Sequence, residues 1–161
     1  MSGMTKYELS DGDISIVAKA VTQRIVVSAE LGLNHATTYQ RDIVTRIREE
    51  SIGAAAELAW ARLNSKEWHA PINEFHQIPD DGINEVRATE HPRGGLIIRS
   101  NDPDDRRYIF ATIKDRVVMF HGWEYGSSVK VDSNLWNPHG RRLAWRLDRS
   151  KLRPMDEIKP E

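Results

Sequence analysis

The 161-residue chain contains no cysteine. Disulfides, thiolate zinc sites and cysteine nucleophiles are therefore excluded. No stretch approaches the roughly 18 consecutive apolar residues of a membrane-spanning helix, so we expect no membrane partner. The start of the chain, MSGMTKYELS, lacks the basic and then apolar order of a signal peptide. These absences predict a cytoplasmic protein.

The chain also lacks any large excess of charge, since 23 Lys and Arg face 24 Asp and Glu for a formal net charge of −1. Bulk charge therefore gives no nucleic-acid signature. The distribution is less even, because six cations against one acid, Asp148, occupy residues 141–153. The candidate phosphate contacts there are Arg141, Arg142 and Arg146. A solvated C-terminal strand and loop is the alternative interpretation.

Several catalytic motifs are missing too. The six histidines show no His-Glu-x-x-His spacing. No Gly-x-Ser-x-Gly elbow or glycine-rich phosphate loop is present. The acidic segment 100–107 lacks the spacing of a calcium loop, so we expect a solvated turn there.

Apolar periodicity predicts helices at about 10–30 and 41–64. In the second, Gly53 makes two helices as reasonable as one. Strands are predicted at 84–89, 95–100, 108–113, 117–122 and 143–147, with a further short strand near Phe75. Short separators between them favour antiparallel neighbours. Helices followed by strands indicate an α+β fold, with N-terminal helices packed on a mostly antiparallel or mixed β-sheet.

The length predicts a single domain over residues 1–161. Its helical part would span about 10–66 and its β-rich part about 72–153, followed by a flexible tail at about 155–161. Trp123, Trp136 and Trp145 lie in or near the predicted strands. Such tryptophans can stack on bases, although core positions are the commoner role.

The segment PDDGINEVRAT, residues 79–89, carries the densest candidate chemistry. Side chains alternate along a strand, so Glu85 and Arg87 share one face while Val86 points to the other. A turn with two aspartates precedes them. Carboxylates that hold Mg²⁺ beside a cation that steadies a phosphate are what a metal-dependent phosphodiesterase needs. A solvated strand face after a purely local turn is the alternative.

Upstream, Glu57 lies in the alanine-rich segment IGAAAELAWARL. Helical geometry places it at the edge of the apolar face. It can therefore lean toward whatever the helix covers, or it can be an ordinary exposed glutamate.

The motifs follow one another in the order helix glutamate, Pro-Asp turn and Glu-x-cation in a strand. In this order the sequence resembles the PD-(D/E)XK, or restriction-endonuclease-like, superfamily. More narrowly, it is similar to small uncharacterised phage and prophage proteins of that group. The resemblance covers roughly residues 13–155 and includes GGLIIRSNDPDDRRYIFAT and FHGWEYG. It implies a restriction-endonuclease-like core and, for a phage-encoded protein, the host cytoplasm.

The resemblance implies catalytic residues Glu57, Asp80, Glu85 and Arg87. Of these, Glu57, Asp80 (or Asp81) and Glu85 would hold Mg²⁺ or Mn²⁺. The implied activity is hydrolysis of a DNA phosphodiester, with DNA as partner. It leaves the oligomeric state undetermined.

Two departures from the family pattern stand out. Arg87 occupies the lysine position, and because arginine keeps its charge it cannot act as a general base. It can still clamp a phosphate. Asp80 and Glu85 would be roughly 16 Å apart in a fully extended chain, so a shared metal requires a reversal at Gly82, which tolerates positive φ.

Three interpretations follow from the sequence. The first is a Mg²⁺-dependent nuclease. The second is a catalytically degenerate nuclease fold that binds nucleic acid or protein through Arg141, Arg142 and Arg146. The third is a small virion or accessory protein whose acids are only surface residues. Magnesium dependence separates the first from the others, and salt-sensitive DNA binding without cleavage supports the second.

Overall fold

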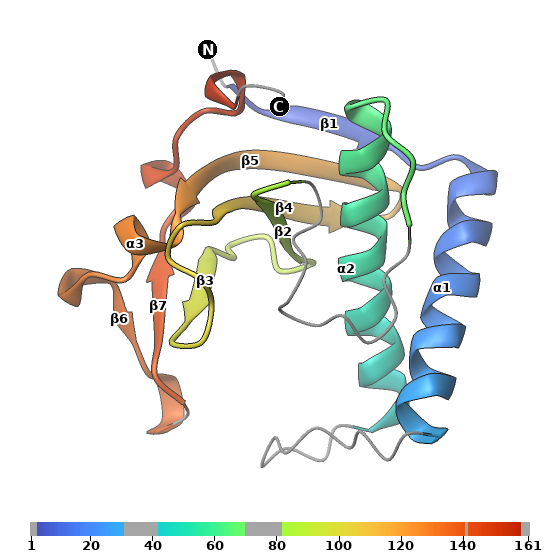
Figure 1. Ribbon diagram of the computed structural model, residues 1–161, viewed down its shortest axis with the longest axis horizontal. Coiled ribbons are helices and arrows are strands. Elements are labelled where there is room, and N and C mark those ends of the chain that lie inside the picture. Colours follow the sequence, from blue (N-terminus) through green and yellow to red (C-terminus); the bar gives the residue numbers. More distant parts are fainter. Residues whose placement is uncertain (1–2, 31–41, 70–81, 141, 159–161) are drawn as a thin grey trace.

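The computed structural model describes residues 3–30, 42–69, 82–140 and 142–158. It has an α+β architecture, with a pair of long helices, a central sheet A and a smaller sheet B (Figure 1). The long helices are α1 (Asp11–Glu30) and α2 (Ile43–Leu63). Sheet A contains β1 (Thr5–Glu8), β2 (Asn84–Thr89), β4 (Arg107–Lys114) and β5 (Val117–Tyr125), and sheet B contains β3 (Leu96–Arg99), β6 (Leu135–Trp136) and β7 (Ala144–Leu147).

The order of strands in sheet A is β1-β5-β4-β2. The β4–β5 and β1–β5 pairs are antiparallel, whereas β2 and β4 are parallel. The prediction of antiparallel neighbours is therefore wrong for β2. Parallel strands need a crossover, and the segment that contains β3 supplies it by leaving sheet A to pair with β7.

Helix α1 begins where the sequence predicts. The Ser10 hydroxyl accepts a hydrogen bond from the Asp13 amide at 3.1 Å, and the Asp13 carboxylate accepts one from the Ser10 amide at 3.0 Å. This reciprocal pair satisfies amides that the first helical turn would otherwise leave unbonded.

Helix α2 is a single helix through Gly53. Asp42 caps its N-terminus by accepting from the Thr45 amide at 2.9 Å. The run from Ala54 to Ala61 is buried except for Glu57. Tertiary packing of this alanine-rich surface outweighs the helix penalty of one glycine, which is about 1 kcal/mol.

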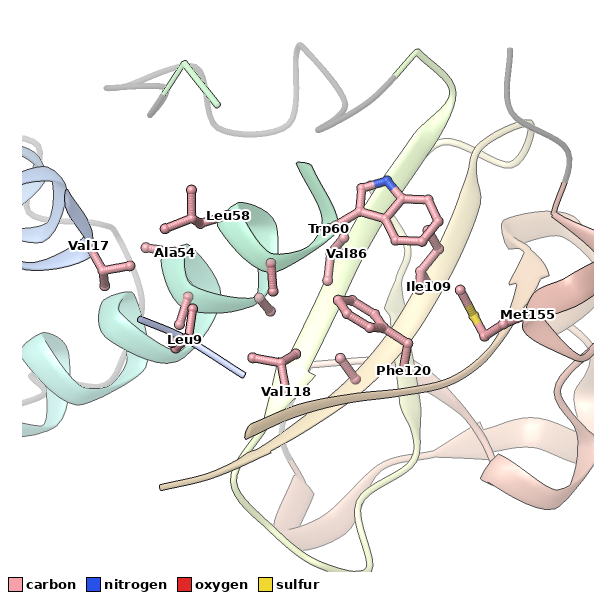
Figure 2. Packing of buried hydrophobic residues seen from close by; sticks show 14 of the residues in the cluster. Leu9, Val17, Ala54, Leu58, Trp60, Val86, Ile109, Val118, Phe120 and Met155 are labelled. Atoms are coloured by element: carbon pink, nitrogen blue, oxygen red, sulfur yellow. The ribbon is translucent and has the colours of Figure 1, made fainter. Parts of the chain in front are cut away.

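The first hydrophobic core lies between the helices and sheet A. Figure 2 shows Trp60 of α2 beside Phe120 of β5, with Val86 and Ile109 close by. The Trp60 and Phe120 ring centroids are 5.6 Å apart. Small alanines on α2 allow this helix to approach the sheet closely, and the large aromatic side chains fill the space beside them.

The second core lies between sheets A and B. It contains Tyr108 and Phe110 of β4 with Leu96 and Ile98 of β3, all at most 2% exposed. Because alternate residues of β4 supply the two cores, sheet A is buried on both faces there.

The C-terminal segment closes over β5. The Trp123 amide and carbonyl pair with Arg153 at 3.0 and 2.9 Å. Gly122 has a φ of 155°, which favours glycine. A Cβ atom at this position would lie 2.7 Å from the Cβ of Leu152, so only glycine allows the C-terminal segment to lie this close. The expected flexible tail begins at Met155, but this side chain is buried in the first core and its amide donates to the Gly3 carbonyl.

Two short strands, β1 and β6, were not expected from the sequence. Residues near Phe75 lie outside the described residues. Within the part of the chain that the structure describes, neither long helix has an apolar stretch suited to crossing a bilayer.

Candidate functional site

Glu85 and Arg87 lie on β2, the edge strand of sheet A that is paired with β4. Val86 belongs to the core under the helices. Glu85 is in register with Tyr108, a residue of the core between the sheets. The alternation along β2 therefore directs Glu85 and Arg87 away from the helices and toward sheet B.

These two side chains form a closed ion network with a third, Asp102. The Arg87 guanidinium donates through one nitrogen, Nη2, to both Glu85 Oε1 and Asp102 Oδ1, the latter at 2.9 Å. Asp102 comes from the turn that follows β3, and it is 2% exposed. Two carboxylates thus converge on one nitrogen atom.

The remaining carboxylate oxygens of the network are also occupied. Arg106 Nη1 donates to Glu85 Oε2 at 2.7 Å. The Arg99 amide donates to Asp102 Oδ2 at 2.8 Å. The Glu85 side chain is 15% exposed. Every oxygen of both acids therefore has a donor, which is what offsets the cost of burying their charges.

The charges of the network reinforce one another. Burial alone would lower the pKa of Arg87, but Glu85 and Asp102 outweigh it and raise that pKa above its ordinary value. Burial, together with the same two carboxylates, also raises the pKa of Tyr108. Tyr108 is therefore a neutral donor, and its hydroxyl bonds the Pro103 carbonyl at 3.0 Å.

Glu57 lies in a different environment. Its carboxylate accepts from Arg24 Nη2 of α1 at 2.9 Å, and Arg24 Nη1 lies 3.5 Å from Glu50. Burial raises the Glu57 pKa, although Arg24 and Trp68 oppose the shift. Since α2 covers the face of sheet A opposite to Glu85, the structure does not bring these two glutamates together.

The remaining predicted carboxylates, Asp80 and Asp81, lie outside the described residues. Gly82 has the expected positive φ, at 55°. In residues 3–30, 42–69, 82–140 and 142–158, no group of three His, Asp or Glu side chains could hold a metal ion. The shared metal site of Glu57, Asp80 and Glu85 therefore stays a prediction.

A second charged region lies on the outer surface of sheet B. Register places Arg99, Arg146 and Trp136 on the face of this sheet that points away from the inter-sheet core. Arg146 donates to the Arg93 carbonyl at 2.9 Å, and Arg149 donates to the Pro92 carbonyl. We call Arg99 and Arg146 the basic face.

Within the described residues, these two arginines form no ion pair with a carboxylate. The nearest acid in sequence, Asp148, accepts hydrogen bonds from the amide and hydroxyl of Ser150. Those bonds lower its pKa, and Arg146 and Arg149 add to the effect. The predicted contact Arg142 is exposed, whereas Arg141 lies outside the described residues.

Sequence reasoning missed Asp102, Arg106 and Arg24. The expectation of a solvated turn at 100–107 is wrong for Asp102, because the turn folds this carboxylate under the Arg99 amide and against Arg87. An aspartate before a proline in a turn is a signal for such local backbone bonding. The partners of Arg24 and Arg106 are 33 and 21 residues away, and no local pattern reveals such pairs.

Comparison of the chain with protein-family models, with curated proteins and with solved structures found no match.

Proposed function

We propose that this protein is a DNA-binding module that uses the basic face of sheet B. One observation carries the proposal: the arginines of this face form no ion pair with a carboxylate among the described residues, whereas the largely buried acids Glu57, Glu85 and Asp102 are each paired with arginine. Guanidinium groups that lie on a surface outside ion pairs suit phosphate contacts. This interpretation corresponds to the degenerate-nuclease alternative.

The ion network supports the same interpretation from the other direction. A metal held by Glu85 and Asp102 would have to displace Arg87, and Arg106 would remain on the second oxygen of Glu85. As the described residues stand, they do not fit Mg²⁺. The network instead holds the edge strand β2 to the turn after β3.

Fluorescence anisotropy with labelled DNA tests the proposal. The variant Arg99→Gln/Arg146→Gln should bind at least about tenfold more weakly than the wild type, since each arginine that bonds a phosphate contributes to the affinity. The matched control Arg48→Gln/Arg116→Gln removes two exposed arginines, 66% and 51% exposed, from outside sheet B. Its affinity should stay within about twofold of wild type.

The salt dependence gives a second readout. Each phosphate contact on a single strand contributes about −0.7 to the slope of log affinity against log salt. The slope of the double variant should therefore be shallower by roughly 1.4. Equal reductions in the variant and the control would assign binding to general charge and reject the basic face.

Mg²⁺-dependent hydrolysis of DNA is the second candidate function, within a restriction-endonuclease-like core. The closeness of two carboxylates, Glu85 and Asp102, is the observation in its favour, and it requires that a metal ion displace Arg87 from between them. Calorimetry with Mg²⁺ and Mn²⁺ tests this candidate. Metal binding by the wild type that is abolished in Glu85→Ala would support it, and no binding by either protein would leave the nuclease without its metal.

A further inference from the structure

The outer surface of sheet B combines an aromatic ring with the arginines, which points to the form of nucleic acid that it binds. Trp136 of β6 is in register with Ala144 of β7, and Ala144 is in register with Arg99 of β3. The three side chains therefore stand in one row on the outer face. Neighbouring strands are about 4.8 Å apart, so Trp136 and Arg99 are separated by roughly 10 Å across the small alanine.

The next row along the strands contains Ile97 and Arg146. Both side chains are half-buried, as is Trp136. Trp136 belongs to neither hydrophobic core. By contrast, Trp145 of β7 packs against the inter-sheet core. A half-buried indole on the edge strand β6, with guanidinium groups on the neighbouring strands β7 and β3, offers a stacking surface with phosphate contacts along one side of it.

We propose that this surface binds single-stranded DNA, with a base stacked on Trp136 and the flanking phosphates on Arg99 and Arg146. This inference rests on the proposed DNA-binding function and specifies its ligand. A duplex hides its base faces, and its major groove is read by an inserted helix or two-stranded ribbon. Sheet B presents a row of side chains from three short strands, and a sheet with a partly exposed aromatic is suited to unstacked bases.

Bases in a single strand expose faces that a duplex keeps stacked. An aromatic side chain with two arginines on the neighbouring strands therefore complements a single strand better than a duplex backbone.

The test compares a labelled twelve-residue oligothymidine with a blunt twelve-base-pair duplex by anisotropy. The wild type should bind the oligothymidine at least about tenfold more tightly. Trp136→Ala should weaken binding of the oligothymidine about tenfold, which corresponds to the removal of one stacked base, and should change duplex binding little. Trp136→Phe, which keeps an aromatic face, should retain most of the affinity.

The outcomes separate this inference from the proposed function. Equal affinities for the two ligands, or equal weakening of both in Trp136→Ala, would overturn the single-strand inference and leave DNA binding intact. No binding of either ligand would reject the proposed function itself. Circular dichroism of each variant establishes folding, and if Trp136→Ala fails to fold, Trp136→Leu takes its place with the same expected effect.

Discussion

Arginines between the two sheets and arginines on the outer face of sheet B have opposite environments. On the side toward sheet A, Arg87 and Arg106 bond to Glu85 and Asp102, and every carboxylate oxygen has a donor. On the outer side, Arg99 and Arg146 form no ion pair with a carboxylate among the described residues. Only Arg99 and Arg146 therefore leave their charge available to a ligand.

This difference shows why residue type alone does not identify a site. Glu-Val-Arg on a strand suggests catalysis, yet here the acid and the cation neutralise each other beside a third group. Buried pairs of this kind are costly to break, because removal of one partner leaves an uncompensated charge. The outer arginines cost little to replace, and their replacement should change binding rather than stability.

The largest effect on stability should follow from Asp102→Ala. This change leaves Arg87 with one carboxylate fewer and the Arg99 amide without its acceptor. We expect a loss of about 3 kcal/mol in the free energy of unfolding, measured by urea denaturation. Asp104→Ala is the control, because its 67% exposed carboxylate pairs with Lys130 at the surface, and it should cost less than about 1 kcal/mol. Similar losses in the two variants would mean that the network is not a stabilising centre.

A smaller loss should follow from Glu57→Ala. Arg24, whose side chain is 6% exposed, would then lose its carboxylate partner at 2.9 Å and keep Glu50 at 3.5 Å. We expect a loss of about 2 kcal/mol in the free energy of unfolding, because Glu50 still lies close to the Arg24 guanidinium. The exposed Glu67→Ala serves as control and should stay within about 0.5 kcal/mol of wild type. DNA binding should not change in Glu57→Ala, and weaker binding by the folded variant would connect this acid to function.

A third prediction concerns pH and the helix side of the molecule. Burial alone would raise the pKa of Asp13, but hydrogen bonds from Ser10, Tyr7 and Arg62 lower it below its ordinary value of 3.8. The stability that Asp13 contributes is therefore present above about pH 4 and is lost as the pH falls through the lower folded value. The difference in unfolding free energy between wild type and Asp13→Asn should be constant from about pH 7 to 5 and should shrink in stronger acid. A difference that grows on acidification would contradict the direction of this shift.

Local patterns predicted much of this fold. The apolar period and Ser10 predicted the start of α1, and alternation predicted β2 at Asn84–Thr89 and the opposite faces of Val86 and Glu85. The sequence did not predict which strands pair. The strand β3 pairs with β7, almost 50 residues later in the chain, and β2 therefore pairs in parallel with β4 instead of with β3.

For the candidate sites too, local patterns predicted the strand positions but not the partners from distant parts of the chain. Glu85 and Arg87 share a face, as the two-residue period of a strand requires. Asp102 and Arg106 enter the network only through the crossover from β2 to β4, which no local pattern encodes. For Arg146, the basic run of the sequence indicated the residue, but only its register with Ile97 indicated which way the side chain points.

The most direct test of this account compares Arg146→Gln with Glu85→Gln in one DNA-binding experiment, at equal concentrations of folded protein. The account predicts that Arg146→Gln weakens binding several-fold and reduces its salt slope, whereas Glu85→Gln lowers stability and leaves the affinity unchanged. The opposite result, with binding abolished in folded Glu85→Gln and kept in Arg146→Gln, would contradict it and would assign nucleic-acid contact to the Glu85–Arg87 network.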